Sequence, residues 1–338
     1  MRRFRLGGIK ILEGRSHLTS SRPAGEPVLP AICSHLAAHQ INLALLTHLA
    51  FDQDGGSITS LCTESADTFS SYFLLKLSYG QGSVVKLESA INILSIFPHD
   101  QRPAVTGTLL ALLIKENVRP HGFASSPSAL SVLVSGADTR KVIDGLFDAF
   151  EFPSFQSPGE WYTAYERRER LLREVECSYQ EKVIKVYNIA HQPNLELWRL
   201  ILPWSRLGDF GTALTAMDRM GIRIPFLVAQ HGQEENLSCG LAFADTHREQ
   251  ARQILALYLP ELDLRRRHPV TAFFITGPHF GDRHGITNTM VQTLQNAAVS
   301  PLAMGCTVSS ISLIVRADDQ ETSRQVLAAS FQVPSDKG

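Results

Sequence analysis

The stretch Ser238-Cys239-Gly240-Leu241-Ala242-Phe243-Ala244-Asp245-Thr246 passes from a β-rich run into the start of a helix, because apolar residues then recur at helical spacing from Ala251 to Tyr258. The triplet Ala-Asp-Thr occurs again at 66–68 and 137–139, and the close variant Ala-Asp-Asp stands at 317–319. Each copy follows a β-rich segment and precedes a helical pattern. The recurrence therefore predicts one structural unit that is repeated four times.

A second strand and helix are expected before each triplet. Helical spacing of apolar residues predicts helices around 28–36, 105–112, 210–217 and 286–294. Strands are predicted before these helices, at 9–12, 91–96, 197–202 and 272–276, and short additional strands at 84–87, 183–187 and 262–265. The resulting order is β-α-β-β-α-β. It predicts an α+β fold of four ferredoxin-like units with antiparallel sheets.

The spacing of the repeats gives the expected boundaries of these units. They are placed at residues 1–83, 84–156, 182–261 and 262–338. The surplus residues 157–181 contain Trp161, Tyr165 and Leu172 at a spacing typical of a helix, so they are expected to form a linker helix. The fourth repeat has no obvious closing strand. Residues 3–7 are therefore expected to complete its sheet.

Composition restricts the class of protein. The chain has 338 residues, 32 Lys and Arg against 33 Asp and Glu, and a net charge of −1. This balance argues against a surface built to neutralise nucleic-acid phosphates, and no apolar run reaches the roughly 20 residues of a membrane-spanning helix. The cysteines are scattered, so reduced and buried thiols are expected. We therefore expect a cytoplasmic protein with neither a nucleic-acid nor a membrane partner.

Familiar catalytic motifs are absent from the sequence. It contains no G-x-x-x-x-G-K-[ST], no G-x-G-x-x-G after a strand, no H-E-x-x-H and no G-x-S-x-G. His35 and His39 have a spacing that can hold a metal on a helix, although two histidines at the margin of an amphipathic helix explain them equally simply. His279, Asp282 and His284 gather in one loop and form a second candidate group. We expect no cofactor, no metal and no catalytic residue.

The loops between the first strand and first helix of the repeats are better candidates for a binding site. In the fourth repeat this loop carries Gly281, Asp282, Arg283, His284, Gly285 and Ile286. Glycines allow close approach of the backbone to a ligand, and the helix start offers unpaired N–H groups to a carboxylate. Asp282 could meet an ammonium group. Comparable residues are Gly208 and Asp209 in the third repeat, and Asp100 and Arg102 in the second.

The fourth repeat resembles an ACT domain, and specifically the second regulatory ACT domain of aspartate kinases. The resemblance rests on Gly277, on residues 282–286 at the start of the helix, on the serine-rich strand 309–315 and on the acidic pair at 318–319. Gln40-Ile41-Asn42-Leu43 in the first repeat is similar to the family's Ile-Asn-Ile entry into its second strand. The resemblance implies that Asn42 is a further ligand-binding residue.

The resemblance also implies a regulatory function, because ACT domains pair and bind free amino acids between units. The kinase domain's Lys-Phe-Gly-Gly opening is missing, so we expect a non-catalytic amino-acid sensor that is not an enzyme. It would act as a homodimer or with a separate catalytic enzyme. One alternative is a regulatory subunit, or a degenerate relative, of aspartate kinase that works beside a separate catalytic chain. A nucleic-acid-binding protein is a less favoured alternative, because the strand at 310–315 has no aromatic residue to stack on a base.

Overall fold

The computed structural model describes residues 3–24, 28–51, 55–79, 84–127, 129–173, 186–232, 236–277, 284–307 and 310–331. These residues form helices and a large antiparallel sheet, which confirms the predicted α+β class. Within these ranges, no helix combines the length and the apolar character needed to cross a membrane.

The elements are as follows. The strands are β1 (Phe4–Arg5), β2 (Gly8–Ala24), β3 (Leu45–Ala50), β4 (Gly55–Glu64), β5 (Val84–Phe97), β6 (Gly122–Ser125), β7 (Leu130–Ser135), β8 (Phe150–Glu151), β9 (Asn188–Pro203), β10 (Phe226–His231), β11 (Asn236–Ala244), β12 (Leu264–Thr276), β13 (Ala303–Cys306) and β14 (Ser310–Arg316). The α-helices are α1 (Leu29–Ala38), α2 (Thr68–Tyr79), α3 (Pro103–Lys115), α4 (Thr139–Ala149), α5 (Pro158–Arg173), α6 (Leu207–Arg219), α7 (Arg248–Tyr258), α8 (Ile286–Asn296) and α9 (Gln320–Ser330).

The order of elements recurs along the described chain. We call β2-α1-β3-β4-α2 repeat 1, β5-α3-β6-β7-α4 repeat 2, β9-α6-β10-β11-α7 repeat 3 and β12-α8-β13-β14-α9 repeat 4. A short 3₁₀ turn lies at each triplet, between the last strand and the last helix of the repeat, at Ser65–Asp67, Gly136–Asp138, Asp245–His247 and Ala317–Asp319. The triplet thus marks the same strand-to-helix junction in every repeat.

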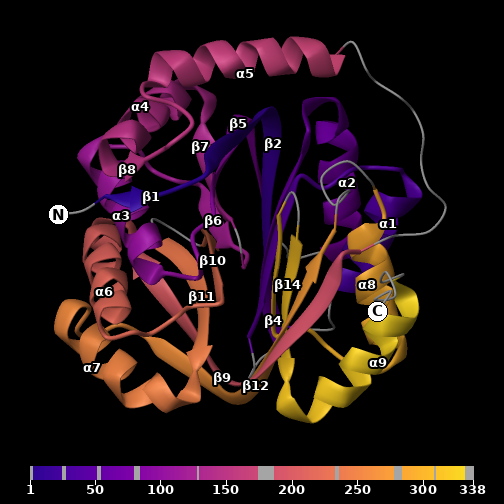
Figure 1. The fold of residues 1–338 in the computed structure, drawn as a ribbon. Coiled ribbons are helices and arrows are strands. Elements are labelled where there is room, and N and C mark those ends of the chain that lie inside the picture. The colour runs from indigo at the N-terminus through magenta and orange to yellow at the C-terminus, as the bar shows by residue number, and fades with distance from the viewer. Residues whose placement is uncertain are drawn as a thin grey trace, which may run out of the picture.

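The strands of all four repeats form one antiparallel sheet that closes on itself (Figure 1). Its strand order is β10-β11-β9-β12-β14-β13-β3-β4-β2-β5-β7-β6, and β6 pairs again with β10. Two pairs therefore join the first and second halves of the chain. β3 pairs with β13 so that His48 lies opposite Met304, and β6 pairs with β10 so that Ala124 lies opposite Val228.

Long strands link neighbouring repeats. The predicted strands 84–87 and 91–96 are parts of one strand, β5, and Ala90 between them has a positive φ of 57°. The predicted strands 262–265 and 272–276 likewise merge into β12, which begins only at Leu264 and is irregular between Arg267 and Ala272. β9 begins at Asn188, so the strand predicted at 183–187 is wrong where the structure describes it.

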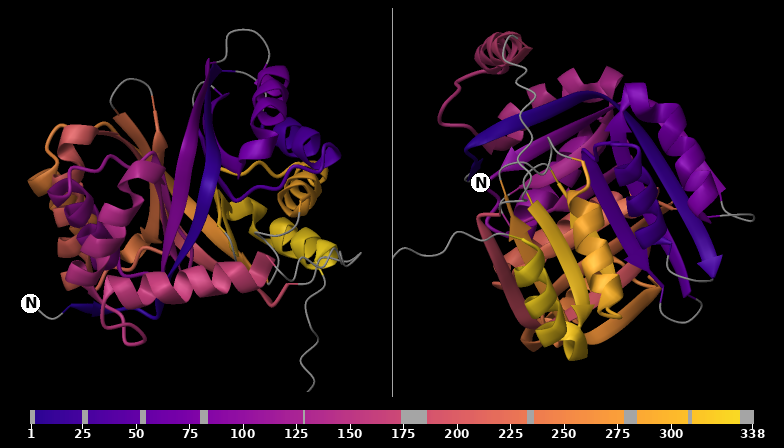
Figure 2. Two further views of the ribbon diagram at one scale, coloured as in Figure 1. Left: turned by 90° about the horizontal axis from the view of Figure 1, so that it is seen from above. Right: turned by 90° about the vertical axis from the view of Figure 1, so that its right-hand side faces the viewer.

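The hydrophobic residues pack into three clusters. One lies under α3, α4, α6 and α7 and a second under α1, α2, α8 and α9, which occupy opposite flanks of the closed sheet (Figure 2). The third consists of strand and loop residues without a helical member, such as Ile58, Phe226 and Ala272, and so fills the interior of the closed sheet. The helices therefore cover the outer faces, and the alternate side chains of each strand meet inside.

The first strand does not complete the fourth sheet as expected. β1 pairs in parallel with β8, with Phe4 opposite Phe150 and Arg5 opposite Glu151. The expected position beside β12 is occupied by the first half of β9, where Ile189 lies opposite Ile275. A strand edge accepts one partner, so the N-terminal segment pairs elsewhere.

The expected linker helix overlaps α5, Pro158–Arg173; residues 174–181 of that prediction lie outside the described residues. α5 crosses one end of the molecule (Figure 1), and its buried Trp161 stacks on Tyr165 with ring centroids 5.1 Å apart. The boundaries 1–83, 84–156, 182–261 and 262–338 stay predictions.

Candidate functional site

A small cavity lies where repeat 1 meets repeat 4. Its volume is about 20 Å³, close to the room that one water molecule needs. Residues of both repeats line it: Cys33, Leu36, Ala37, Ile41 and Leu43 from repeat 1, and Gly285, Ile286, Thr287, Asn288, Cys306, Thr307 and Ile311 from repeat 4. The cavity therefore lies at the interface between two segments of the chain that are far apart in sequence.

The pairing of β3 with β13 places the two sides of this cavity next to each other. Leu46 of β3 lies opposite Cys306 of β13, and α1 then packs beside α8 on the outer face of the joined strands. Gln292 of α8 donates a hydrogen bond to the Pro30 carbonyl of α1, with 3.0 Å between Nε2 and O. The interface is therefore built by strand pairing and held by helix packing.

The start of α8 supplies the polar side of the cavity. Gly285 precedes the helix with a φ of +85°, which favours glycine because it lacks a Cβ atom. The first helical hydrogen bond runs from Thr289 N–H to Gly285 O. The N–H groups of residues 286–288 come before it, so they have no carbonyl within the helix to bond. Asn288 Oδ1 is buried and has no hydrogen-bond partner among the described residues.

The opposite side of the cavity is apolar. Leu36 and Ile41 are buried, and so are the thiols Cys33 and Cys306. Burial raises the pKa of the Cys33 thiol and raises that of Cys306 to about 12. Both thiols are therefore protonated near neutral pH and act as small apolar groups. The cavity combines hydrogen-bonding groups at a helix start with an apolar wall.

The predicted binding residues separate into several places. Gly285 and Ile286 line the cavity, and the half-buried His284 directly precedes them. Asn42 lies between the lining residues Ile41 and Leu43. The two motifs that the sequence placed in different repeats thus come together. Gly281, Asp282 and Arg283 lie outside the described residues.

At the equivalent interface between repeats 2 and 3, the helices α3 and α6 are in direct contact. Gly107 of α3 and Gly211 of α6 meet there so closely that a Cβ atom on Gly107 would lie 2.4 Å from Gly211 O. Arg102 donates to both carboxylate oxygens of Asp218, at 3.2 and 2.6 Å. The N–H of Ile224 donates to Gln101 O at 3.1 Å. A direct helix contact and an ion pair therefore hold repeats 2 and 3 together.

The remaining predicted residues do not join the first cavity. Arg102 lines a second cavity of about 720 Å³, whose other charged residues are Arg3, Arg5, Glu151, Asp218 and Arg219. Asp100 precedes Arg102 with a positive φ of 52°. Gly208 and Asp209 begin α6, where Asp209 accepts a hydrogen bond from Arg206 at 2.5 Å. Asp100, Gly208 and Asp209 do not line either of these two cavities.

The candidate metal ligands His35 and His39 each form a hydrogen bond with a group of their own repeat. His35 Nδ1 lies 2.8 Å from Ser78 Oγ, and His39 Nδ1 lies 2.9 Å from the His35 carbonyl. His279 and Asp282, the other candidate group with His284, fall outside the described residues. Sequence reasoning missed Thr287 and Asn288. A search one turn beyond the glycine at the helix start would have found both.

Comparisons with known proteins show what the chain resembles. No protein-family model matches it, and no curated protein matches its sequence. Among solved structures, an aspartate kinase from Synechocystis matches with a TM-score of 0.79 and 13% identity, covering 98% of this chain and 58% of that chain. The ligand-free regulatory subunit of aspartate kinase from Thermus thermophilus matches with a TM-score of 0.39 and 15% identity, covering 44% of this chain and 99% of that chain.

The similarity to the Synechocystis enzyme contradicts the expectation that this chain is not an enzyme. That expectation rested on missing motifs and on a missing opening segment, yet the structure matched over 98% of this chain is an aspartate kinase. The absence of known motifs is weak evidence against an enzyme, because backbone N–H groups at helix starts hold phosphate in many sequence contexts. At 13% identity the similarity shows a shared fold, and this chain spans 58% of that kinase's length.

Proposed function

We propose that this chain is an aspartokinase-related regulatory protein that binds a free amino acid between repeats 1 and 4. Under this proposal the repeats are ferredoxin-like units of the ACT type, paired side by side. The observation that carries it is the cavity at which Ile41 and Leu43, on either side of Asn42, meet Gly285 and Ile286. The shared fold with an aspartate kinase over 98% of the chain supports the aspartokinase relation.

The lining of the cavity fits the two ends of an amino acid. The first-turn N–H groups of α8 favour a carboxylate, because they are unpaired within the helix and carry partial positive charge. Asn288 Oδ1 is an acceptor for an ammonium group. Cys33, Leu36 and Ile41 would contact an apolar or short side chain. The proposed ligand class is therefore a free amino acid without a second charge.

The size of the cavity gives the proposed regulatory step. A volume of about 20 Å³ is too small for any amino acid, so binding requires α1 and α8 to move apart. A ligand that binds the separated arrangement shifts the population toward it. Because β3 and β13 connect these helices to the closed sheet, the change would reach the rest of the molecule. The proposed receiver is an aspartokinase catalytic domain or a second copy of this chain.

A thermal-shift screen of the full chain against the twenty amino acids tests the proposal. At a concentration 100 times the dissociation constant, a ligand stabilises the folded state by about 2.7 kcal/mol, which corresponds to a rise of about 4 °C in melting temperature. Asn288→Ala should reduce this rise to less than half. Asn296→Ala, at the exposed far end of the same helix, is the matched control and should keep it.

Two outcomes of this screen would contradict the proposal. If no amino acid at millimolar concentration shifts the melting temperature, amino-acid binding is wrong. If a shift is present and equal in the wild type and in Asn288→Ala, the ligand binds at another place. Steady-state kinetics of an aspartokinase catalytic domain, with and without this chain and the ligand, then tests the regulatory part.

A further inference from the structure

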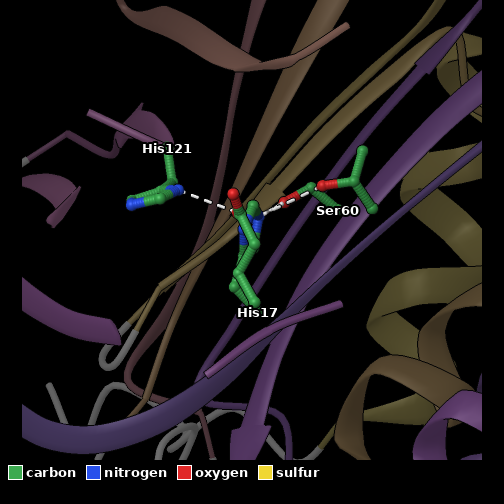
Figure 3. Close-up of polar contacts among 5 residues, drawn as sticks. His17, Ser60 and His121 are labelled. Carbon is green, nitrogen blue, oxygen red and sulfur yellow. Dashed lines mark hydrogen bonds and ion pairs between the residues drawn. The ribbon is translucent and has the colours of Figure 1, made fainter. Parts of the chain in front are cut away.

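Three side chains that could ligate a metal converge beside the interior of the closed sheet, and none of them lines the proposed ligand cavity. His17 Nδ1 and His121 Nδ1 each lie 2.8 Å from the same oxygen of Glu88, Oε2. One ligand atom from each residue lies within 4.8 Å of the others. In Figure 3, His17 stands between His121 on one side and Ser60 on the other. Two imidazoles and a carboxylate thus face one point.

Strand register brings these residues together. His17 of β2 and Glu88 of β5 are direct partners in the antiparallel ladder. His121 stands immediately before β6, and its N–H donates to the Leu133 carbonyl of β7 at 2.9 Å. The group therefore connects the sheet of repeat 1 with the end of a hairpin in repeat 2. Because β6 also pairs with β10, the group lies next to the pair that closes the sheet.

The ring of His17 is oriented by its second nitrogen. His17 Nε2 lies 2.6 Å from Ser60 Oγ and 3.3 Å from Thr19 Oγ1. A histidine that binds a metal through one nitrogen commonly donates from the other to an oxygen, which fixes the ring and its tautomer. Ser60 is in position to accept that hydrogen bond. The hydrogen bond that would orient His17 as a metal ligand is therefore present between its Nε2 and Ser60 Oγ.

Access and charge also suit a cation. The side chain of His17 is fully buried, whereas Glu88 is 37% exposed and His121 is 21% exposed. The group is thus open to solvent on one side. Burial raises the pKa of Glu88, but hydrogen bonds from His121 and His17 outweigh it and hold that pKa below its usual range. With both rings neutral, the three side chains carry one negative charge.

We propose that His17, Glu88 and His121 bind a divalent transition-metal ion of the zinc class, with solvent in the remaining coordination position. Two histidines and one glutamate are a known zinc ligand set, with bonds of about 2.0–2.2 Å. In the metal-free protein the two Nδ1–H groups hydrogen-bond to Glu88. On binding, each neutral ring exchanges to its Nε2–H tautomer through solvent, and the Nε2–H of His17 donates to Ser60. No net proton is released by the rings.

The bound ion ties β2 and β5 to the start of the β6–β7 hairpin. It replaces two hydrogen bonds with three coordinate bonds at the seam of the closed sheet, so it stabilises the folded chain. This inference is independent of the amino-acid cavity, which shares none of its residues.

Titration of ZnCl₂ into the untagged, chelator-treated full chain, followed by calorimetry, tests the site. The wild type should bind one equivalent of zinc. His121→Gln and Glu88→Gln should bind zinc at least tenfold more weakly. His39→Gln is the matched control, because His39 is an exposed histidine whose Nδ1 bonds within its own helix. It should bind as the wild type does. Substitution with CoCl₂ should give visible absorption bands in the wild type that His121→Gln lacks.

The inference is overturned if the wild type binds no saturable equivalent of zinc, or if His121→Gln binds with unchanged affinity. Circular dichroism and melting temperature in EDTA establish that each variant is folded. His121 is partly exposed, so its variant provides the comparison if Glu88→Gln fails to fold. Added zinc should also raise the melting temperature of the wild type and leave that of His121→Gln unchanged.

Discussion

His48 of β3 is buried beneath α2 and takes part in a short chain of hydrogen bonds. Its Nδ1 lies 2.9 Å from Thr59 Oγ1, and the hydroxyl of Tyr79 donates to the same oxygen at 2.9 Å. Burial lowers the pKa of His48 to about 4. The folded protein therefore holds this ring neutral at pH values where the unfolded chain would protonate it.

This difference predicts that His48 reduces stability in acid. Its unfolded pKa is 6.5 and its folded pKa is about 4, so the unfolded state binds more protons between these values. The contribution of the neutral His48 ring to the free energy of unfolding is fully present above pH 6.5. It is lost progressively as the pH falls toward 4, and the total loss is roughly 3 kcal/mol. Urea unfolding of the wild type and of His48→Gln at pH 7.5, 6, 5 and 4.5 measures this loss.

The glutamine in His48→Gln keeps a hydrogen-bonding side chain without a titrating ring, so the stability of the variant should fall less steeply with pH. Parallel curves for the two proteins would show that His48 does not contribute. Burial also lowers the pKa of His17, His99 and His231. The protein should therefore remain acid-sensitive even after His48 is replaced.

At the scale of elements, α2 shows how a helix can be predicted while its buried face is not. Phe69 and Phe73 stand four residues apart, as residues on one helix face do, yet they are 76% and 67% exposed. Leu74, Leu75 and Tyr79 are buried instead. The helix has apolar residues around most of its circumference, so periodicity alone does not select the side that contacts the sheet.

The crossing of α3 and α6 depends on the glycine pair. A Cβ atom on Gly107 would lie 2.4 Å from Gly211 O and 2.5 Å from Thr215 Oγ1. We predict that Gly107→Ala forces the helices apart and lowers the free energy of unfolding by about 2 kcal/mol, although alanine is the better helix former by about 1 kcal/mol. Chemical denaturation measures the change.

Gly208→Ala is the matched control for this prediction. It lies at the start of α6, where the nearest atom to an added Cβ is 4.0 Å away, on Ile114. This variant should be as stable as the wild type or slightly more so. Equal effects of the two substitutions would mean that the helix crossing does not require glycine.

At the scale of the whole molecule, the two halves of the chain share one closed sheet. Gln230 of β10 is buried, accepts a hydrogen bond from Thr47 of β3 at 2.5 Å and donates to the Ile58 carbonyl of β4 at 2.9 Å. These bonds cross the interior of the sheet. Together with the pairs β3–β13 and β6–β10, they connect residues 1–156 with the second half of the chain.

We predict that the protein unfolds in one cooperative transition, because neither half can open without breaking the shared sheet. Gln230→Ala should lower the free energy of unfolding by about 2 kcal/mol, since it leaves a buried hydroxyl without its acceptor. Differential scanning calorimetry checks both points. Two separate transitions in the wild type would contradict the coupling of the two halves through the closed sheet.

Repetition and local periodicity in the sequence were sufficient to predict the α+β class, the strand-to-helix junctions and most helices. Gly285 and Ile286 were selected because glycine at a helix start is a local signal, and Asn42 was selected through the resemblance to ACT domains. The sequence could not predict that these residues meet, since their contact depends on the pairing of β3 with β13. It likewise misplaced the N-terminal strand, whose partner depends on which edge is free.

The tertiary structure alone decided the contacts between residues far apart in the chain. His17, Glu88 and His121 are separated by 71 and 33 residues, and no spacing rule links them. The glycine contact between α3 and α6 and the cavity between repeats 1 and 4 also appear only in three dimensions. Secondary structure follows from interactions between near neighbours in sequence, whereas cavities and side-chain clusters depend on how a closed sheet brings its edges together.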